Sequence, residues 1–217
     1  IVGRWMGARR KEIILASKLR PATDNDFSGD VEGMRRFIIA NIRARRRRIQ
    51  EGLVASFDTC GFDVDTEFLK IGKGSLGGKA RGLVFLSNLL HRHPELHRKY
   101  PQVNITFPRT LVITTEGFDA FIADNHLQGL KETELTDSDV AELFLRAEFP
   151  AWLEERLHLY LSQVNLPLAI RSSGLLEDNH YQPYAGLYRT YMLPNNHSDL
   201  ATRLEQLVTA IKLIYAS

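Results

Sequence analysis

Cysteine is nearly absent from this 217-residue chain, which contains Cys60 alone. A single cysteine excludes an internal disulfide framework and is typical of a reducing compartment, so a cytoplasmic location is expected. The chain also lacks an apolar run of about 18 residues and an apolar N-terminal signal segment, which argues against a membrane-spanning helix and a membrane partner. What remains is an ordinary globular composition, with 44% hydrophobic and 25% charged residues, enough to bury a substantial core.

Positive charge is concentrated in the first part of the chain. Residues 1–60 contain 13 Lys and Arg against 7 Asp and Glu, whereas the remainder contains 15 against 19. This asymmetry predicts two zones with different roles. We therefore expect a basic helical extension and linker over residues 1–66 and a second domain over residues 67–217.

The basic zone is expected to form two helices. Residues 1–20 predict a helix that ends near Pro21, and apolar residues at helical spacing predict a second helix from Val31 to about Leu53, with Asp30 as its N-cap. Arginines crowd the other faces of this second helix between residues 43 and 48. They could contact nucleic-acid phosphates, but aromatic residues for base stacking are nearly absent beside them. A docking arm is the favoured interpretation, and a non-catalytic regulatory or nucleic-acid-docking module using residues 43–48 is kept as the alternative.

A glycine-rich loop follows the short apolar run from Phe68 to Ile71. The segment from Gly72 to Lys79 reads GKGSLGGK, and leucines at helical spacing begin at Leu83. Glycines allow positive φ and close approach of the backbone to a ligand. A helix that begins here offers unpaired N–H groups, a positive dipole end and a lysine, which together predict an anion site, most naturally for phosphate.

Three other interpretations apply to a glycine-rich loop of this kind. A Walker A loop needs glycine six residues before the lysine and Ser or Thr after it, whereas Lys73 and Ala80 stand there. The glycines at positions 72, 74 and 77 satisfy G-x-G-x-x-G, but Glu95, the nearest acid at a suitable distance, follows Pro94 rather than ending a second strand. A glycine-rich turn with solvated lysines remains open for the loop taken alone.

A second polar feature lies between two apolar, β-rich runs that span Leu168 to Met192. These runs predict two strands joined by a long loop. Arg171 closes the first run, and Thr190 opens the second. Alone, Arg171 fits a strand-end arginine that reaches solvent. Together with Lys79 it supplies the charges needed to hold a polyphosphate, because a guanidinium can bind two oxygens at once.

Between these features, short strands and helices are expected. The segment from Val103 to Thr114 is β-rich but contains Pro108, which predicts short strands or an edge strand. Thr115 is the predicted N-cap of one helix, and Thr136 or Asp137 that of the next. Pro150 is expected to interrupt this second helix or to open another, and a last helix is predicted from about Ser198.

Three histidines, at positions 91, 93 and 97, have a spacing that invites comparison with a metal site. Pro94 breaks the helical geometry between them, and no cysteine or paired carboxylate accompanies them. We therefore expect no metal ligands among them.

Two motifs in this order resemble a known family. The segment from Gly77 to Leu83 reads GGKARGL and is similar to a GGKxxxL loop. The segment from Ile170 to Ser173 reads IRSS, and the pairs Glu177-Asp178 and Ala185-Gly186 and then Thr190 follow it. Together these resemble the VRSS…ED…FAG…T signature of the nucleotide-binding domain of the phosphoenolpyruvate synthase and pyruvate phosphate dikinase family. The resemblance extends roughly from Phe68 to Ser217.

The resemblance implies an α+β fold, the first lobe of an ATP-grasp-like nucleotide-binding domain preceded by the helical extension. It implies that Lys79 and Arg171 are catalytic residues that contact phosphate. The residues implied to bind the nucleotide are Gly77, Gly78, Lys79, Arg171, Glu177, Asp178, Gly186 and Thr190. The cofactors implied are ATP and Mg²⁺, with the metal ligands expected outside this stretch of chain.

The resemblance also implies a kinase or phosphotransferase activity. MgATP would phosphorylate a histidine on a swivelling domain of the same polypeptide, most naturally for phosphoenolpyruvate synthesis from pyruvate or another acceptor at a distant site. His180 lacks the context of that histidine, and the C-terminal lobe and later domains are not found in these residues, so the segment alone is expected to be inactive. Departures at Ala80, Pro183-Tyr184 and Leu187 lie beside the implied nucleotide site.

Overall fold

The computed structural model describes residues 30–50, 54–57, 59, 62–63, 66–129, 135–174 and 188–217, without the side chains of residues 43–50 and 97. The helix predicted over residues 1–20 lies outside the described residues, as does Cys60. Contacts divide the chain into two compact units, Ile1–Gln50 and Glu51–Ser217, and each is described by itself.

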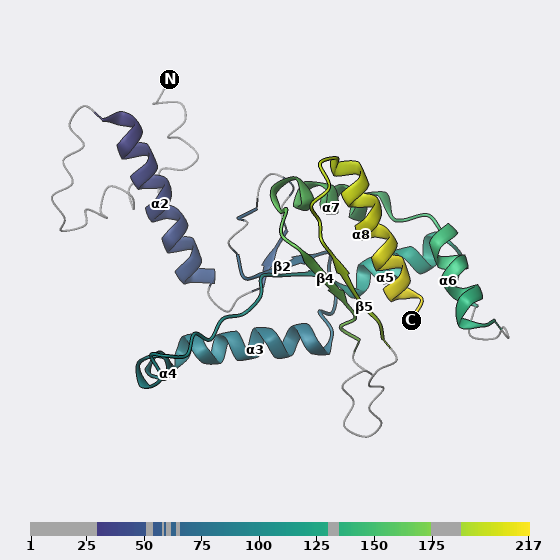
Figure 1. Cartoon of the computed structure of the whole chain (residues 1–217), viewed down its shortest axis with the longest axis horizontal. Helices are drawn as coiled ribbons and strands as arrows, with labels where there is room; N and C mark the ends of the chain where they lie inside the picture. Colours follow the sequence, from purple (N-terminus) through teal and green to yellow (C-terminus); the bar gives the residue numbers. More distant parts are fainter. Residues whose placement is uncertain are drawn as a thin grey trace. The chain divides into compact units, whose positions relative to one another are not determined.

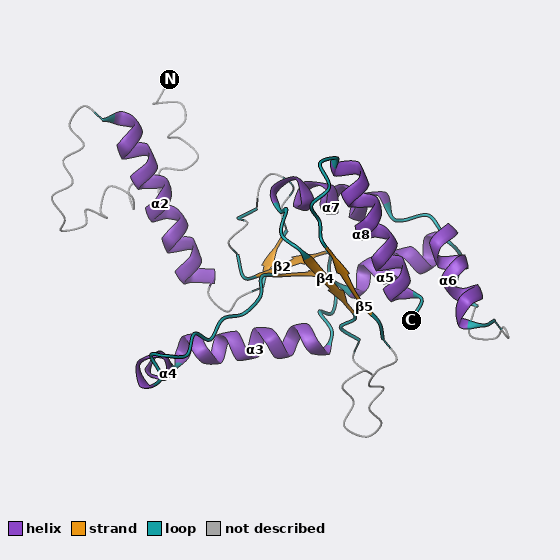
Figure 2. Cartoon of the chain, viewed as in Figure 1, coloured by secondary structure: helices purple, strands orange, loops and turns teal. Residues whose placement is uncertain are grey.

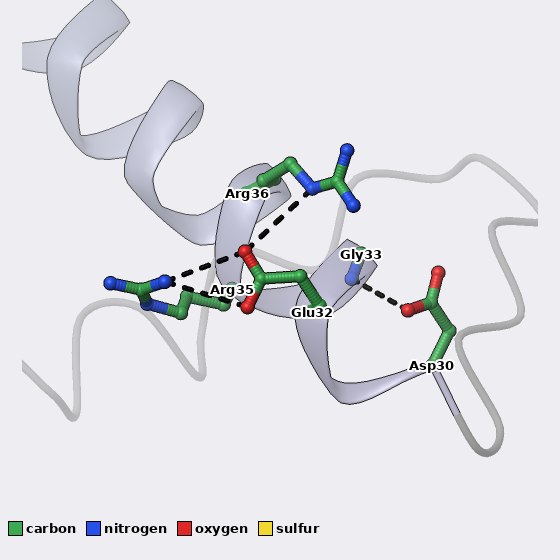
Figure 3. Close-up of polar contacts among 5 residues, drawn as sticks. All are labelled: Asp30, Glu32, Gly33, Arg35 and Arg36. Atoms are coloured by element: carbon green, nitrogen blue, oxygen red, sulfur yellow. Dashed lines mark hydrogen bonds and ion pairs between the residues drawn. The ribbon is translucent and has the colours of Figure 1, made fainter.

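The described part of the first unit is helix α2, Val31–Gln50. Its first turn is held by the Asp30 carboxylate, which accepts the Gly33 N–H at 2.7 Å (Figure 3). Glu32 pairs with Arg35 at 3.4 Å and with Arg36 at 3.8 Å. The prediction of Asp30 as N-cap is therefore confirmed, since its side chain satisfies one of the orphan N–H groups of the helix.

The second unit is built on a parallel three-stranded sheet in the order β1-β2-β3, with β1 at Ala55–Ser56, β2 at Phe68–Ile71 and β3 at Thr110–Ile113 (Figure 2). The central strand β2 is almost wholly buried, as expected for a parallel strand covered on both faces. β3 forms an edge and begins after Pro108, which confirms the prediction of an edge strand. Residues 55–56, expected to lie in the linker that ends at residue 66, form strand β1 instead.

Six helices accompany these strands in the described part of the second unit. They are α3 (Gly78–Arg92), α4 (Glu95–Lys99), α5 (Thr115–Asp124), α6 (Asp137–Arg146), α7 (Ala151–Gln163) and α8 (Leu200–Tyr215). Thr136 caps α6 in a capping box with Asp139, and Pro150 opens α7, both as predicted. The N-cap of α5 is Thr114, one residue before the predicted Thr115. No helix in the described ranges is both long and apolar enough to cross a bilayer.

The main hydrophobic core lies between the parallel sheet and helices α7 and α8, which appear above the strands in Figure 1. Leu153, Leu157 and Leu161 recur at four-residue spacing on α7 and form its buried stripe. Leu207 and Ile211 supply the matching stripe on α8. The helices are thus positioned by their apolar faces, which leaves the ends of the strands available for polar loops.

A two-stranded antiparallel hairpin joins the same core, with β4 at Leu168–Arg171 and β5 at Thr190–Leu193. This confirms the two strands predicted on either side of the polar loop. Leu168 and Ile170 of β4 and Leu193 of β5 pack against the core cluster. Parallel and antiparallel strands with separate helices make the fold α+β, as predicted.

Asp199 gives the stability of this fold a dependence on pH. Its carboxylate accepts the Thr202 hydroxyl at 2.7 Å and the Thr202 N–H at 2.9 Å, capping α8. These hydrogen bonds, the hydroxyl first, lower the pKa of Asp199 in the folded protein. A group with a lowered folded pKa stabilises the protein above its unfolded pKa, near 3.9, and this stabilisation is lost as the pH falls through the folded pKa.

We expect the thermal midpoint of the Asp199→Asn variant to fall less than that of the parent protein between pH 7 and pH 3, because the amide oxygen keeps an acceptor that does not titrate. Asp124→Asn, at the exposed end of α5, is the matched control. Equal acid sensitivity of the Asp199→Asn variant and the parent protein would contradict this assignment.

Candidate functional site

The glycine-rich loop leaves the carboxyl end of β2 and leads into α3. Gly72, Gly74 and Gly77 all have positive φ, at 89°, 97° and 80°. Such values are readily adopted only by glycine, which explains why these three positions carry no side chain. The loop therefore has a specific folded shape.

That shape is held by the start of α5. The buried hydroxyl of Thr114 donates to the carbonyls of Ile71 and Lys73, and the Lys73 N–H donates to the Glu116 carboxylate. Thr115 accepts the Ser75 N–H through its hydroxyl at 3.2 Å and donates its own N–H to the Ser75 carbonyl at 3.1 Å. Sequence reasoning treated Thr115 only as a helix cap, and it missed Thr114 and Glu116 as anchors of the loop.

The same loop is joined to the end of β4 by Ser173. The Gly78 N–H donates to the Ser173 carbonyl at 2.9 Å, and the Ala80 N–H donates to the Ser173 hydroxyl at 3.0 Å. The Ser173 hydroxyl in turn donates to the Leu76 carbonyl at 2.9 Å. The two sequence motifs are thus in direct contact.

Gly77 lies at the closest point of this contact. A Cβ atom placed on Gly77 would lie 1.6 Å from the Ser173 carbonyl oxygen and 2.6 Å from its hydroxyl. Real Cβ atoms do not approach a backbone oxygen so closely, so only glycine allows α3 to begin against β4. The second glycine of the predicted GGK loop, Gly78, then supplies one of the N–H donors.

Arg171 and Thr190 lie opposite each other in the β4–β5 hairpin, and both are exposed. Arg171 precedes Ser173 by two residues, and Lys79 lies between the two residues whose N–H groups Ser173 accepts. The structure therefore places the backbone of Lys79 beside Ser173, two residues beyond the Arg171–Thr190 pair of the hairpin. Glu177, Asp178, His180 and Gly186 lie within residues 175–187, outside the described residues.

The expectation that backbone N–H groups cradle phosphate is corrected at two positions of this helix terminus. Ser173 accepts the Gly78 and Ala80 N–H groups. In the loop before it, the N–H groups of Lys73, Ser75 and Gly77 donate to side-chain oxygens of the protein. Five backbone N–H donors are thus paired within the chain, so the binding of an anion at this helix terminus depends chiefly on side chains. This pairing also disfavours the dinucleotide interpretation, which needs the loop backbone to meet a pyrophosphate.

Arg81 is a further cation that sequence reasoning left out of the site. Its guanidinium donates to the Ser75 hydroxyl at 2.5 Å, which turns the side chain back along α3 toward the glycine loop. Ser75 also accepts the Gly77 N–H at 3.2 Å. The signal that could have indicated this residue is its position two residues after Lys79 in the first turn of α3.

Metal-ligand clusters of three or more His, Cys, Asp or Glu side chains are not found among the described residues. His91 contacts the Ser87 carbonyl through Nδ1 at 2.8 Å, and His93 contacts Glu95 at 2.6 Å. The described part of the junction therefore offers cations and hydroxyl groups, a combination that suits a phosphorylated ligand.

Comparison with known proteins gives one match. The family described as "Pyruvate phosphate dikinase, AMP/ATP-binding domain" matches residues 73–217, well over half of the chain. The matched range begins in the glycine-rich loop and includes both motifs that meet at Ser173. No curated protein and no solved structure matches the chain.

Proposed function

The chain belongs to the pyruvate phosphate dikinase AMP/ATP-binding domain family, and from this premise we propose that ATP binds where α3 meets the end of the β4–β5 hairpin. The observation that carries the proposal is the contact of Ser173 with Gly78 and Ala80. It joins the strand of Arg171 to the helix turn of Lys79. Residues 67–217, together with strand β1 at Ala55–Ser56, would then form the first lobe of the ATP-binding domain, and the residues up to Gln50 its helical extension.

In this proposal, Lys79 and Arg171 neutralise the charge of the phosphate chain. An ammonium group and a guanidinium fork are the side chains that most often hold phosphate oxygens. Thr190, paired with Arg171 in the hairpin register, would donate its hydroxyl to the same phosphates. Phosphoryl transfer depends mainly on positioning and charge stabilisation, so residues of these types suffice for this half of a site.

Mg²⁺ is not assigned a ligand in the described part of the chain. Magnesium prefers oxygen ligands, usually one or two carboxylates together with substrate phosphates. The carboxylate of Glu116 accepts the Lys73 N–H, and the described residues form no group of three or more His, Cys, Asp or Glu side chains that could hold a metal ion. By the family resemblance, we propose that the ion is held by ATP itself and by acids outside residues 1–217.

The finer proposal concerns the reaction. We infer a kinase-type phosphotransferase in which ATP phosphorylates a histidine on a swivelling domain, and phosphoenolpyruvate synthesis from pyruvate is the favoured whole reaction. Membership of the AMP/ATP-binding domain family supports the use of ATP as phosphoryl donor. The histidine and pyruvate acceptors are proposed from the family resemblance alone.

Titration calorimetry on the full-length protein provides the test of nucleotide choice. We expect ATP with Mg²⁺ to bind more tightly than NADH, because the loop backbone is already paired and a triphosphate offers more charge to the two cations. Replacing Arg45, Arg46, Arg47 and Arg48 by glutamine is the control, and it should leave the ATP affinity unchanged. Tighter binding of NADH would revive the dinucleotide interpretation, and a loss of ATP binding in the control would favour the arginine-rich helix as the phosphate site.

A further inference from the structure

Ser173 caps helix α3 from a distant part of the chain. In an ordinary N-cap, a serine at the first position accepts the N–H of the second or third helical residue. Here the N-cap of α3 is Gly77, which makes no side-chain capping bond, and the N–H of the third helical residue, Ala80, is accepted by the Ser173 hydroxyl at 3.0 Å. Ser173, which follows β4, thus supplies the side-chain capping hydrogen bond that Gly77 cannot form.

The capping contact has three parts and uses both the donor and an acceptor of the hydroxyl. Besides accepting the Ala80 N–H, the hydroxyl donates to the Leu76 carbonyl at 2.9 Å, and the Ser173 carbonyl accepts the Gly78 N–H at 2.9 Å. Ser173 therefore forms hydrogen bonds with Gly78 and Ala80, the residues immediately before and after Lys79. Ser173 and Ala80 are 93 residues apart in the sequence.

We propose that Ser173 is a positioning residue that fixes Lys79 relative to Arg171 and so sets the affinity of the site for the phosphate chain of ATP. This inference rests on the proposed function. Its physical basis is that charged groups hold a ligand best when their supporting shell keeps them within about 0.5 Å of the productive geometry. Ser173 lies two residues beyond Arg171 and contacts both neighbours of Lys79, so it is the shortest connection between the two cations among the contacts described above.

The first experiment compares ATP affinities of the parent protein and the Ser173→Ala variant by calorimetry. We expect the variant to bind ATP about tenfold more weakly, since the hydroxyl loses its hydrogen bonds to Ala80 and Leu76 and Lys79 is held less firmly. Ser162→Ala is the matched control, because the Ser162 hydroxyl donates only to the Leu159 carbonyl at the exposed end of α7. Its ATP affinity should equal that of the parent protein.

The second experiment separates positioning from a general loss of structure. If Ser173 acts through Lys79, the Ser173→Ala change in a Lys79→Ala background should weaken ATP binding by less than about threefold, because the group that it positions is gone. A purely structural role predicts that the two losses multiply. If Ser173→Ala does not fold, Ser173→Cys replaces it in the same cycle, since a thiol keeps the size but is a weak donor and acceptor.

Two failures remain distinguishable. If the parent protein does not bind ATP, or binds it equally well without Lys79, the proposed function is wrong. If ATP binding depends on Lys79 but Ser173→Ala retains the full affinity, or if the two losses multiply, the positioning role of Ser173 is wrong while the site stands.

Discussion

The Lys79→Ala variant is expected to bind ATP roughly 10 to 100 times more weakly than the parent protein, because a hydrogen bond to a charged group contributes about 1.5–3 kcal/mol. We expect a loss of the same order for Arg171→Ala. Arg171→Lys should recover only part of it, since an ammonium group cannot form the two parallel hydrogen bonds of a guanidinium. Calorimetry with ATP on the folded variants measures all three effects.

Lys73→Ala is the control that isolates the role of Lys79. It removes the same charge from the same loop, yet the hydrogen bonds of Lys73 to Glu116 and Thr114 are made by its backbone and survive the change. We expect its ATP affinity to stay close to that of the parent protein. If Lys73→Ala and Lys79→Ala weaken binding equally, the lysines act only as a diffuse positive field, and the assignment of a specific phosphate contact is wrong.

The Gly77→Ala variant is expected to lose ATP binding altogether and to unfold at a clearly lower temperature. Its φ of 80° already disfavours a side chain, and the added methyl group would lie 1.6 Å from the Ser173 carbonyl oxygen. Because that oxygen belongs to the backbone, no rotamer change relieves the overlap. Helix α3 must therefore move away from β4, which separates Lys79 from Arg171.

Gly82→Ala is the matched control for this prediction. Gly82 lies inside α3, and a Cβ atom there meets nothing within 4 Å. Alanine in a helix interior is favoured over glycine by about 0.5–1 kcal/mol, so this variant should melt at the same or a higher temperature and bind ATP normally. Calorimetric unfolding and ATP titration of both variants give the comparison, and normal ATP binding by Gly77→Ala would contradict the contact between α3 and β4.

Several elements of this fold follow from local sequence. The capping residues Asp30 and Thr136 and the two strands on either side of the polar loop each carry their own signal, and the structure confirms them. The candidate site follows from sequence only as far as its residue types. Glycine, lysine and arginine side by side indicate a phosphate ligand. The local sequence does not show that residues so far apart in the chain lie side by side in the fold.

The parts that sequence analysis missed depend on distant contacts. Thr114 is identified as a loop anchor only once β3 lies beside β2, and Ser173 as a cap only once β4 reaches α3. The same contacts explain the error about the helix terminus. Unpaired N–H groups are a sound expectation for an isolated helix, but here another segment of the chain accepts them first. Strand β1 was missed because two residues, Ala55 and Ser56, are too few to show any periodicity.

Strand β1 also determines where the protein can be shortened for recombinant expression. It precedes residue 73, where the family match begins, yet it pairs with β2, and Phe57 beside it is part of the main core. A polypeptide started at residue 67 would turn β2 from a central strand into a bare edge with a row of unpaired N–H and C=O groups, a known cause of aggregation. An expression boundary ahead of Val54 keeps that edge covered.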